Sequence, residues 1–197
     1  MTGLFEPAPG GAAITLDETT VVVLRHYFAQ MVDLIGGDDP APVADSAEAL
    51  VGSAFADGPS KPPDNPILAR LFPDAYGDFG QDPNHADLAA SAEFRRYTEN
   101  DLRARKRADA LAVLATLEPL APTGDDEVEV RLDGDGSRHW LGALNDLRLA
   151  VGTRLKITDD REHDEYLDLP DDDPRQSMAR VYLWLGSLQE TLIDCLE

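Results

Sequence analysis

The chain has 197 residues, which fits one domain and is long enough to bury a sizeable core. Its apolar fraction of 43% is near the globular average and argues against wholesale disorder. With 38 acidic and 17 basic residues, the net charge is −21. Such a charge repels nucleic acid at long range and favours partners that carry basic patches.

The chain opens with two short apolar segments at residues 3–6 and 12–16, separated by the turn sequence PAPGG. They predict two small strands or an irregular lead-in to the first helix. Asp17 is a good N-cap, and the apolar residues after it recur at helical spacing as far as Ile35. Gly36 and its glycine neighbour should end this first helix.

Residues 38–64 are rich in Pro, Gly and Asp and predict a mobile insertion within a single domain. Residues 47–55 could form a short helix inside the insertion. Residues 65–72 predict another short helix, because Pro66 would occupy its first position.

Residues 85–117 predict the longest helix, which Pro119 would terminate. Residues 127–132 (EVEVRL) alternate charged and apolar side chains, a pattern typical of a strand. The sequence DGDG that follows predicts a turn, and Ser137 is the expected cap of a helix that runs to about Ile157.

Residues 158–174 predict an acidic loop, and Asp173 or Pro174 should begin a last helix that reaches the C-terminus. The predicted fold is therefore α-dominant. It has four long helices, one or two short ones, and a minor sheet built from the N-terminal segments and strand 127–132.

The helices at 137–157 and 175–196 each carry a regular apolar stripe, which predicts that they pack against each other. Arg148 and Arg154 fall on the shoulders of the first stripe. We expect both to be buried and paired across the seam, since buried charges are normally paired. The expected structural polar network consists of Asn145, Asp146, Arg148, Arg154, Gln189 and Glu190.

Six basic residues lie within 13 positions of the longest helix: Arg95, Arg96, Arg103, Arg105, Lys106 and Arg107. They are candidates for contact with an acidic protein partner or with a DNA backbone. The alternative is a solvated face that pairs with the chain's own surplus carboxylates.

No motif points to catalysis, a metal or a cofactor, and we expect none of them. The segment 133–137 (DGDGS) resembles a calcium loop, but Arg138 and Leu144 occupy the positions of its required glycine and glutamate. The four histidines have no zinc-ligand spacing. The N-terminus lacks a secretory signal, and no apolar run is long enough to span a bilayer, so we expect a cytoplasmic protein.

Two further features have alternative interpretations. The run from Asp159 to Asp173 holds nine acidic residues, which indicate a solvated loop or a docking site for a basic partner. Cys195 is the only cysteine, so no disulfide can form within the chain. It is expected to be a covered apolar side chain, the alternative being a redox-active thiol at the end of the last helix.

Four segments resemble one known family. They are W-x-x-x-LNDLRLAVGTRL from Trp140, V-Y-x-WL-x-x-LQE-x-L from Val181, PILARLFPDAY at 66–76 and EFRRYTENDLRARK at 93–106. Together they resemble the AosR-like family, an actinobacterial domain of unknown function whose name refers to oxidative stress regulation. The resemblance implies a mainly helical, cytoplasmic regulator that acts on transcription through RNA polymerase and a sigma factor.

The leading hypothesis is therefore a non-enzymatic regulator that works through protein contacts. The alternative is a DNA-binding transcription factor that uses the basic segment 95–107. A redox switch that needs two thiols in one chain is excluded by the single Cys195.

Overall fold

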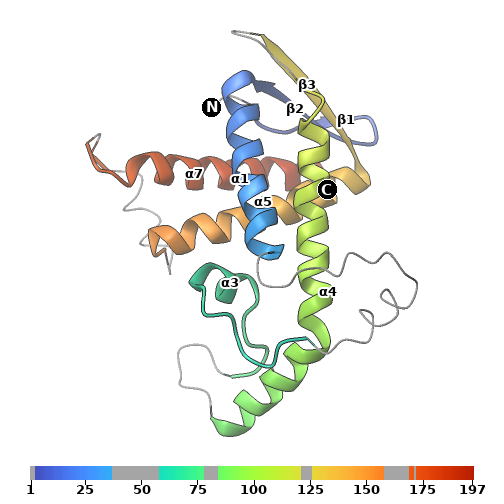
Figure 1. Ribbon diagram of the computed structural model, residues 1–197. Helices are drawn as coiled ribbons and strands as arrows, with labels where there is room; N and C mark the ends of the chain where they lie inside the picture. Colours follow the sequence, from blue (N-terminus) through green and yellow to red (C-terminus); the bar gives the residue numbers. More distant parts are fainter. Residues whose placement is uncertain (1–2, 37–57, 78–83, 121–125, 158–168, 171) are drawn as a thin grey trace.

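A computed structural model describes residues 3–36, 58–77, 84–120, 126–157, 169–170 and 172–197. The proposed helix at 47–55, most of the expected 38–64 insertion and most of the acidic loop lie outside these residues. The elements are β1 (Glu6–Ala8), β2 (Gly11–Asp17), α1 (Glu18–Gly36), α3 (Pro66–Leu71), α4 (His85–Leu117), β3 (Glu127–Asp133), α5 (Gly134–Leu155) and α7 (Gln176–Asp194). The predicted α-dominant fold with a minor sheet is confirmed (Figure 1).

The sheet is antiparallel with the order β1-β2-β3, and Ile14 of β2 lies opposite Val130 of β3. Alternate residues of β2 are buried, as expected for a strand with one face on the core. The first strand is Glu6–Ala8 rather than residues 3–6. Phe5 instead packs edge-to-face on Trp140, with 5.7 Å between the ring centroids.

The start of α5 differs from the prediction. The helix begins at Gly134, directly after β3, and its N-cap is Asp133, whose Oδ1 accepts a hydrogen bond of 2.7 Å from the Gly136 amide. Ser137, the predicted cap, is a fully buried residue of the first turn. Two capping residues stand close together in this sequence, and the strand that precedes them fixes which one the helix uses.

Helix α5 is the centre of the core. It packs against α7, as its stripe predicted, and also against α4, α3, α1 and the sheet. Trp140 and Leu144 are completely buried on α5, as are Leu185 and Leu188 on α7. Trp184 of α7, in contrast, is only partly buried and packs against the edge of the core.

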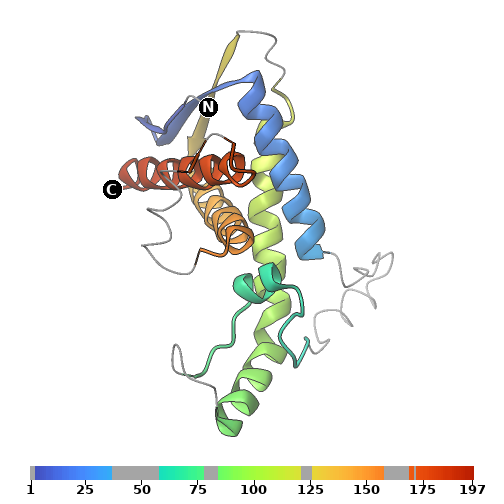
Figure 2. The same cartoon turned by 90° about the vertical axis from the view of Figure 1, so that its left-hand side faces the viewer.

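Helices α1 and α4 stand side by side, and α5 and α7 cross them (Figures 1 and 2). Arg25 of α1 caps the far end of α4, since its Nη2 donates to the carbonyl oxygens of Leu117 at 2.6 Å and Leu120 at 2.9 Å. The N-terminal half of α4 extends beyond the body, with the α3 segment, residues 66–77, beside it (Figures 1 and 2).

Candidate functional site

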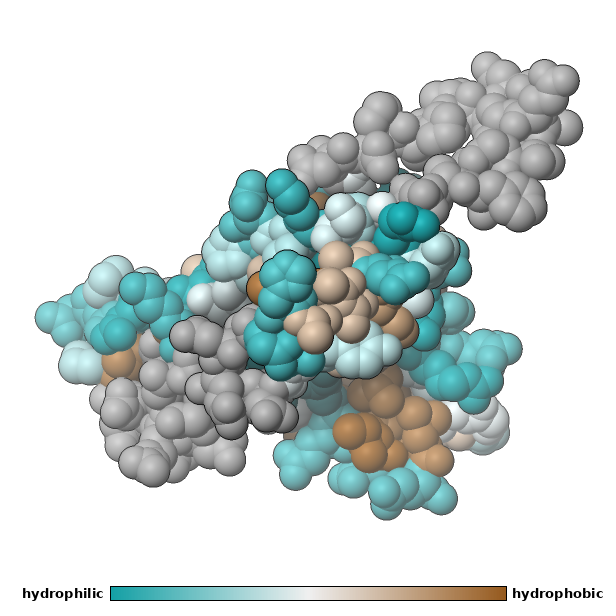
Figure 3. Space-filling view, turned by 90° about the horizontal axis from the view of Figure 1, so that it is seen from below, coloured by the Kyte–Doolittle hydropathy of each residue, from teal (hydrophilic) through white to brown (hydrophobic). Residues whose placement is uncertain are grey.

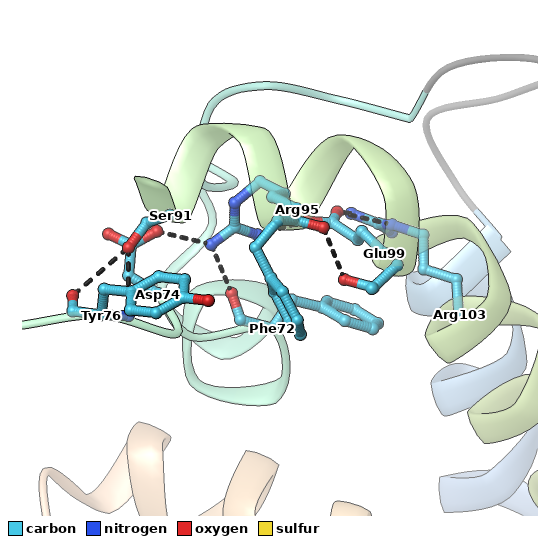
Figure 4. A network of polar contacts seen from close by, with 9 residues as sticks. Phe72, Asp74, Tyr76, Ser91, Arg95, Glu99 and Arg103 are labelled. Atoms are coloured by element: carbon cyan, nitrogen blue, oxygen red, sulfur yellow. Dashed lines mark hydrogen bonds and ion pairs between the residues drawn. The ribbon is translucent and has the colours of Figure 1, made fainter. Parts of the chain in front are cut away.

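A buried arginine fixes the projecting half of α4 to the α3 segment. The Arg95 side chain is 4% exposed, and its Nη2 donates to Phe72 O and to Asp74 Oδ1, both at 2.9 Å. Its Nη1 donates to Glu99, one helical turn further along α4 (Figure 4). Burial opposes the charge on Arg95, but the hydrogen bonds and charges of Asp74 and Glu99 outweigh it and raise the pKa of the guanidinium.

A second arginine extends this network towards α1. Arg103 Nε donates to Glu99 Oε1 at 2.9 Å, and its Nη1 donates to Ile35 O at 3.1 Å, in the last turn of α1. The guanidinium also lies over the ring of Phe72, 4.4 Å from the centroid. Ser91 completes the same face of α4 by exchanging hydrogen bonds with the Tyr76 backbone. We call Arg95, Glu99, Arg103 and Asp74 the arginine network.

The six predicted contact residues do not all lie on one exposed surface. Arg95 and Arg103 belong to the arginine network, and Lys106 binds Asp146 of α5, with 2.6 Å from Nζ to Oδ1. Arg96, Arg105 and Arg107 are exposed. Glu99 was missed by the sequence analysis, although its spacing of four residues from both network arginines is the signal for such pairs on a helix.

Beside the network, aromatic side chains are exposed on the projecting half of α4 and the loop next to it. Tyr76 is 49%, Phe94 47% and Tyr97 61% exposed. Tyr76 and Phe94 meet edge-to-face with their centroids 6.1 Å apart, and the Arg96 guanidinium lies over the Tyr97 ring at 5.0 Å. We call these four residues the aromatic patch. Figure 3 views this end of the molecule and shows apolar surface between hydrophilic residues.

The seam between α5 and α7 contains part of the expected polar network. Arg148 is partly buried, donates to Gln189 Oε1 at 3.4 Å and lies over the Tyr182 ring at 4.9 Å. A Cβ at Gly186 would lie 3.4 Å from the Arg148 Nε, so this glycine gives the guanidinium room against α7. The contact is mainly a stacking contact, because its hydrogen bond is long.

Other members of that network lie elsewhere. Arg154 is exposed, so the prediction that it is buried in the seam is wrong, and Glu190 is exposed as well. The reason is that Arg154 lies on the face of α5 that carries Leu147, towards α1 and α3, whereas Arg148 lies on the face towards α7. Asn145 contacts Asp146 at 3.5 Å, and Asp146 faces α4 rather than α7.

A row of polar pairs joins α4 to α5. Next to the pair of Lys106 and Asp146, His139 Nδ1 lies 2.7 Å from Asp109 Oδ1. Burial raises the pKa of Asp146, although Lys106 and Asn145 oppose the shift. The pairs fix how the two helices lie along each other.

Cys195 is partly covered beside the core. Burial, together with the charges of Asp194 and Glu6, raises the pKa of its thiol. The thiolate is the reactive form, so these surroundings lower the reactivity of Cys195 at neutral pH.

Within the described part of the chain, no cluster of three or more His, Cys, Asp and Glu side chains could hold a metal ion. None of the described helices has the length and apolar character needed to cross a membrane.

Comparison with known proteins identifies relatives along almost the whole chain. Oxidative stress regulator AosR of Mycobacterium tuberculosis is 31% identical over 176 residues, which cover 87% of this chain and 75% of the relative. A protein of Mycobacterium leprae whose name also refers to AosR is 33% identical over 178 residues, 88% of this chain and 76% of that protein. No solved structure matches. The family model of a domain of unknown function, DUF2017, matches residues 1–196, and the chain therefore belongs to that family.

Proposed function

We propose that this chain is a non-enzymatic regulator of the oxidative stress response that acts by binding another protein. The names of the mycobacterial relatives refer to oxidative stress regulation, which supports the biological role. The observation that carries the mode of action is the aromatic patch on the projecting half of α4.

The aromatic patch has the composition of a binding surface. Tyr and Arg are enriched at protein interfaces and at the residues that contribute most of the binding energy. Phe94 and Tyr97 lie three residues apart on α4, so one partner surface could cover both. The arginine network beneath them holds this half of α4 in place, which lowers the entropy lost on binding.

The partner is inferred from charge and from the relatives. A chain of net charge −21 attracts a protein with basic surface and is steered towards it at long range. A sigma factor or RNA polymerase, which the family resemblance suggests, is the partner that we propose. Direct DNA binding is the alternative, and it is weakened because Arg95, Arg103 and Lys106 are engaged inside the protein.

The proposal is tested by measuring, by interferometry, the affinity of the full chain for mycobacterial RNA polymerase with and without its sigma factors. The double variant Phe94→Ser/Tyr97→Ser should weaken binding at least about tenfold, because one residue that dominates an interface contributes about 2 kcal/mol and about 1.4 kcal/mol is tenfold in affinity. The matched control is Val22→Ser, which removes an apolar side chain that is similarly exposed, but on α1. It should bind like the unmodified chain.

Two results would contradict the proposal. One is binding that the double variant leaves unchanged, or no binding to any form of the polymerase. The other is tight binding of duplex DNA that falls steeply with salt and is lost in Arg96→Gln/Arg107→Gln, since phosphate contacts release counterions. That second result would favour the DNA-binding alternative.

A further inference from the structure

A cavity of about 520 Å³ lies where α1, α3 and α5 meet, with the first turn of α7 at its side. It is separate from the aromatic patch and from the arginine network, none of whose residues line it. Its volume is within the range of small-molecule sites, about 300–1,000 Å³, and such sites commonly lie between helices.

The inner wall of the cavity is apolar and firmly packed. The buried residues that line it come from three helices: Met31, Ile67, Leu68, Leu147, Ala150 and Val151. This apolar wall lies at the base of a pocket that is open to the surface on its other side. Met31 and Met178 add flexible side chains that adjust to the shape of a guest.

The outer rim carries the polar groups. Of the described lining residues, Arg154 and Asp33 are the charged ones, and neither takes part in an ion pair between described residues. Two further polar side chains at the rim have internal bonds, since Asn65 caps α3 and the Gln30 side chain bonds His26, and Tyr27 adds a phenol to the lining. Arg154 is thus a guanidinium at the mouth of an apolar cavity, in a protein with a large excess of acids.

We propose that this cavity binds a small amphipathic carboxylate, with its hydrocarbon body against the inner wall and its head group on Arg154. A guanidinium binds a carboxylate through two parallel charge-assisted hydrogen bonds. A guanidinium is also more weakly hydrated than an ammonium, so removing its water when a ligand covers the rim costs less free energy. Asp33 could bind a cationic head group, but it would not form a two-point contact of this kind with an ammonium. The negative charge of Asp33 also weakens the binding of an anion.

The test uses the full chain and three probes of equal length: decanoate, decanol and decylammonium, titrated by calorimetry below their micelle concentrations. Decanoate should bind most tightly. Arg154→Gln should weaken decanoate about tenfold, the value of one good charged contact, and leave decanol unchanged. Asp33→Asn should strengthen decanoate.

Two further variants locate the site. Arg131→Gln changes an exposed arginine of β3 that does not line the cavity; it is the matched control and should leave the binding of decanoate unchanged. Ala150→Leu should fill part of the cavity and weaken decanoate and decanol alike. If Ala150→Leu does not fold, the Arg154→Gln variant still tests the proposal, because Arg154 is exposed and its replacement leaves the core unchanged.

The proposal is overturned if decanoate binds no better than decanol, or if Arg154→Gln leaves its affinity unchanged. It is also overturned if decylammonium binds best and loses affinity in Asp33→Asn, which would make the cavity a site for cations. Absence of binding by all three probes would show that the cavity takes no ligand of this class.

Discussion

The arginine network makes a strong prediction for Glu99. This carboxylate is 3% exposed and accepts from Arg95 on one side and from Arg103 on the other. Glu99→Gln keeps the shape but removes the charge. Arg95 donates to Oε2 and Arg103 to Oε1, and the amide replaces one of these two oxygens by an NH2 group that cannot accept. A hydrogen bond to a charged group contributes about 1.5–3 kcal/mol. Leaving a buried arginine poorly paired adds to the loss, so we expect the free energy of unfolding to fall by about 2–4 kcal/mol.

The matched control acts on the same arginine. Asp74 also binds Arg95, at 2.9 Å, but its side chain is 34% exposed. Water screens that pair, so Asp74→Asn should cost no more than about 1 kcal/mol. A third variant, Arg95→Met/Glu99→Met, removes both buried charges together and should recover much of the stability lost in Glu99→Gln.

Urea unfolding followed by circular dichroism measures these differences, and hydrogen exchange locates them. For a chain of this size, the loss in Glu99→Gln corresponds to a melting temperature lower by about 4–16 °C. Amide protection should fall first in the projecting half of α4, which contacts the body least. The reasoning is refuted if the free energy of unfolding of Glu99→Gln lies within about 0.5 kcal/mol of that of the unmodified chain. It is also refuted if Asp74→Asn lowers this free energy more than Glu99→Gln does.

Three further outcomes are expected. Trp140→Ala should cost about 3–5 kcal/mol in urea unfolding and Trp184→Ala clearly less, because only Trp140 is fully buried; equal losses would contradict this. The raised pKa of Asp146 means that the folded state holds its proton above the ordinary value of 3.8, so this residue contributes less stability as pH rises through that window. The stability of Asp146→Asn relative to the unmodified chain should therefore increase from pH 4 upward, and a difference that stays flat or falls would show that Lys106 controls the titration. Peroxide should produce little disulfide-linked dimer on a non-reducing gel, since the pKa of the Cys195 thiol is raised; rapid, complete dimer formation that Cys195→Ser abolishes would make the last helix a redox sensor.

The sequence by itself determined the elements and the fold class. Apolar residues at helical spacing identified the four long helices, and alternation in EVEVRL identified the strand that pairs with β2. These patterns are local, because a helix or strand must place its apolar side chains on one face to bury them. The packing of α5 on α7 followed from the same stripes.

Only the tertiary structure decided what the charged residues do. On a helix, a solvated arginine and a buried, paired one occupy the same kind of position, and the difference depends on which element packs there. The α3 segment covers Arg95, the end of α1 accepts from Arg103, and α5 supplies Asp146 for Lys106. Arg154 is the opposite case, since it lies exposed at the rim of the cavity between α1, α3 and α5. The cavity and the aromatic patch were beyond the sequence for the same reason: both depend on where three or more segments meet or fail to meet.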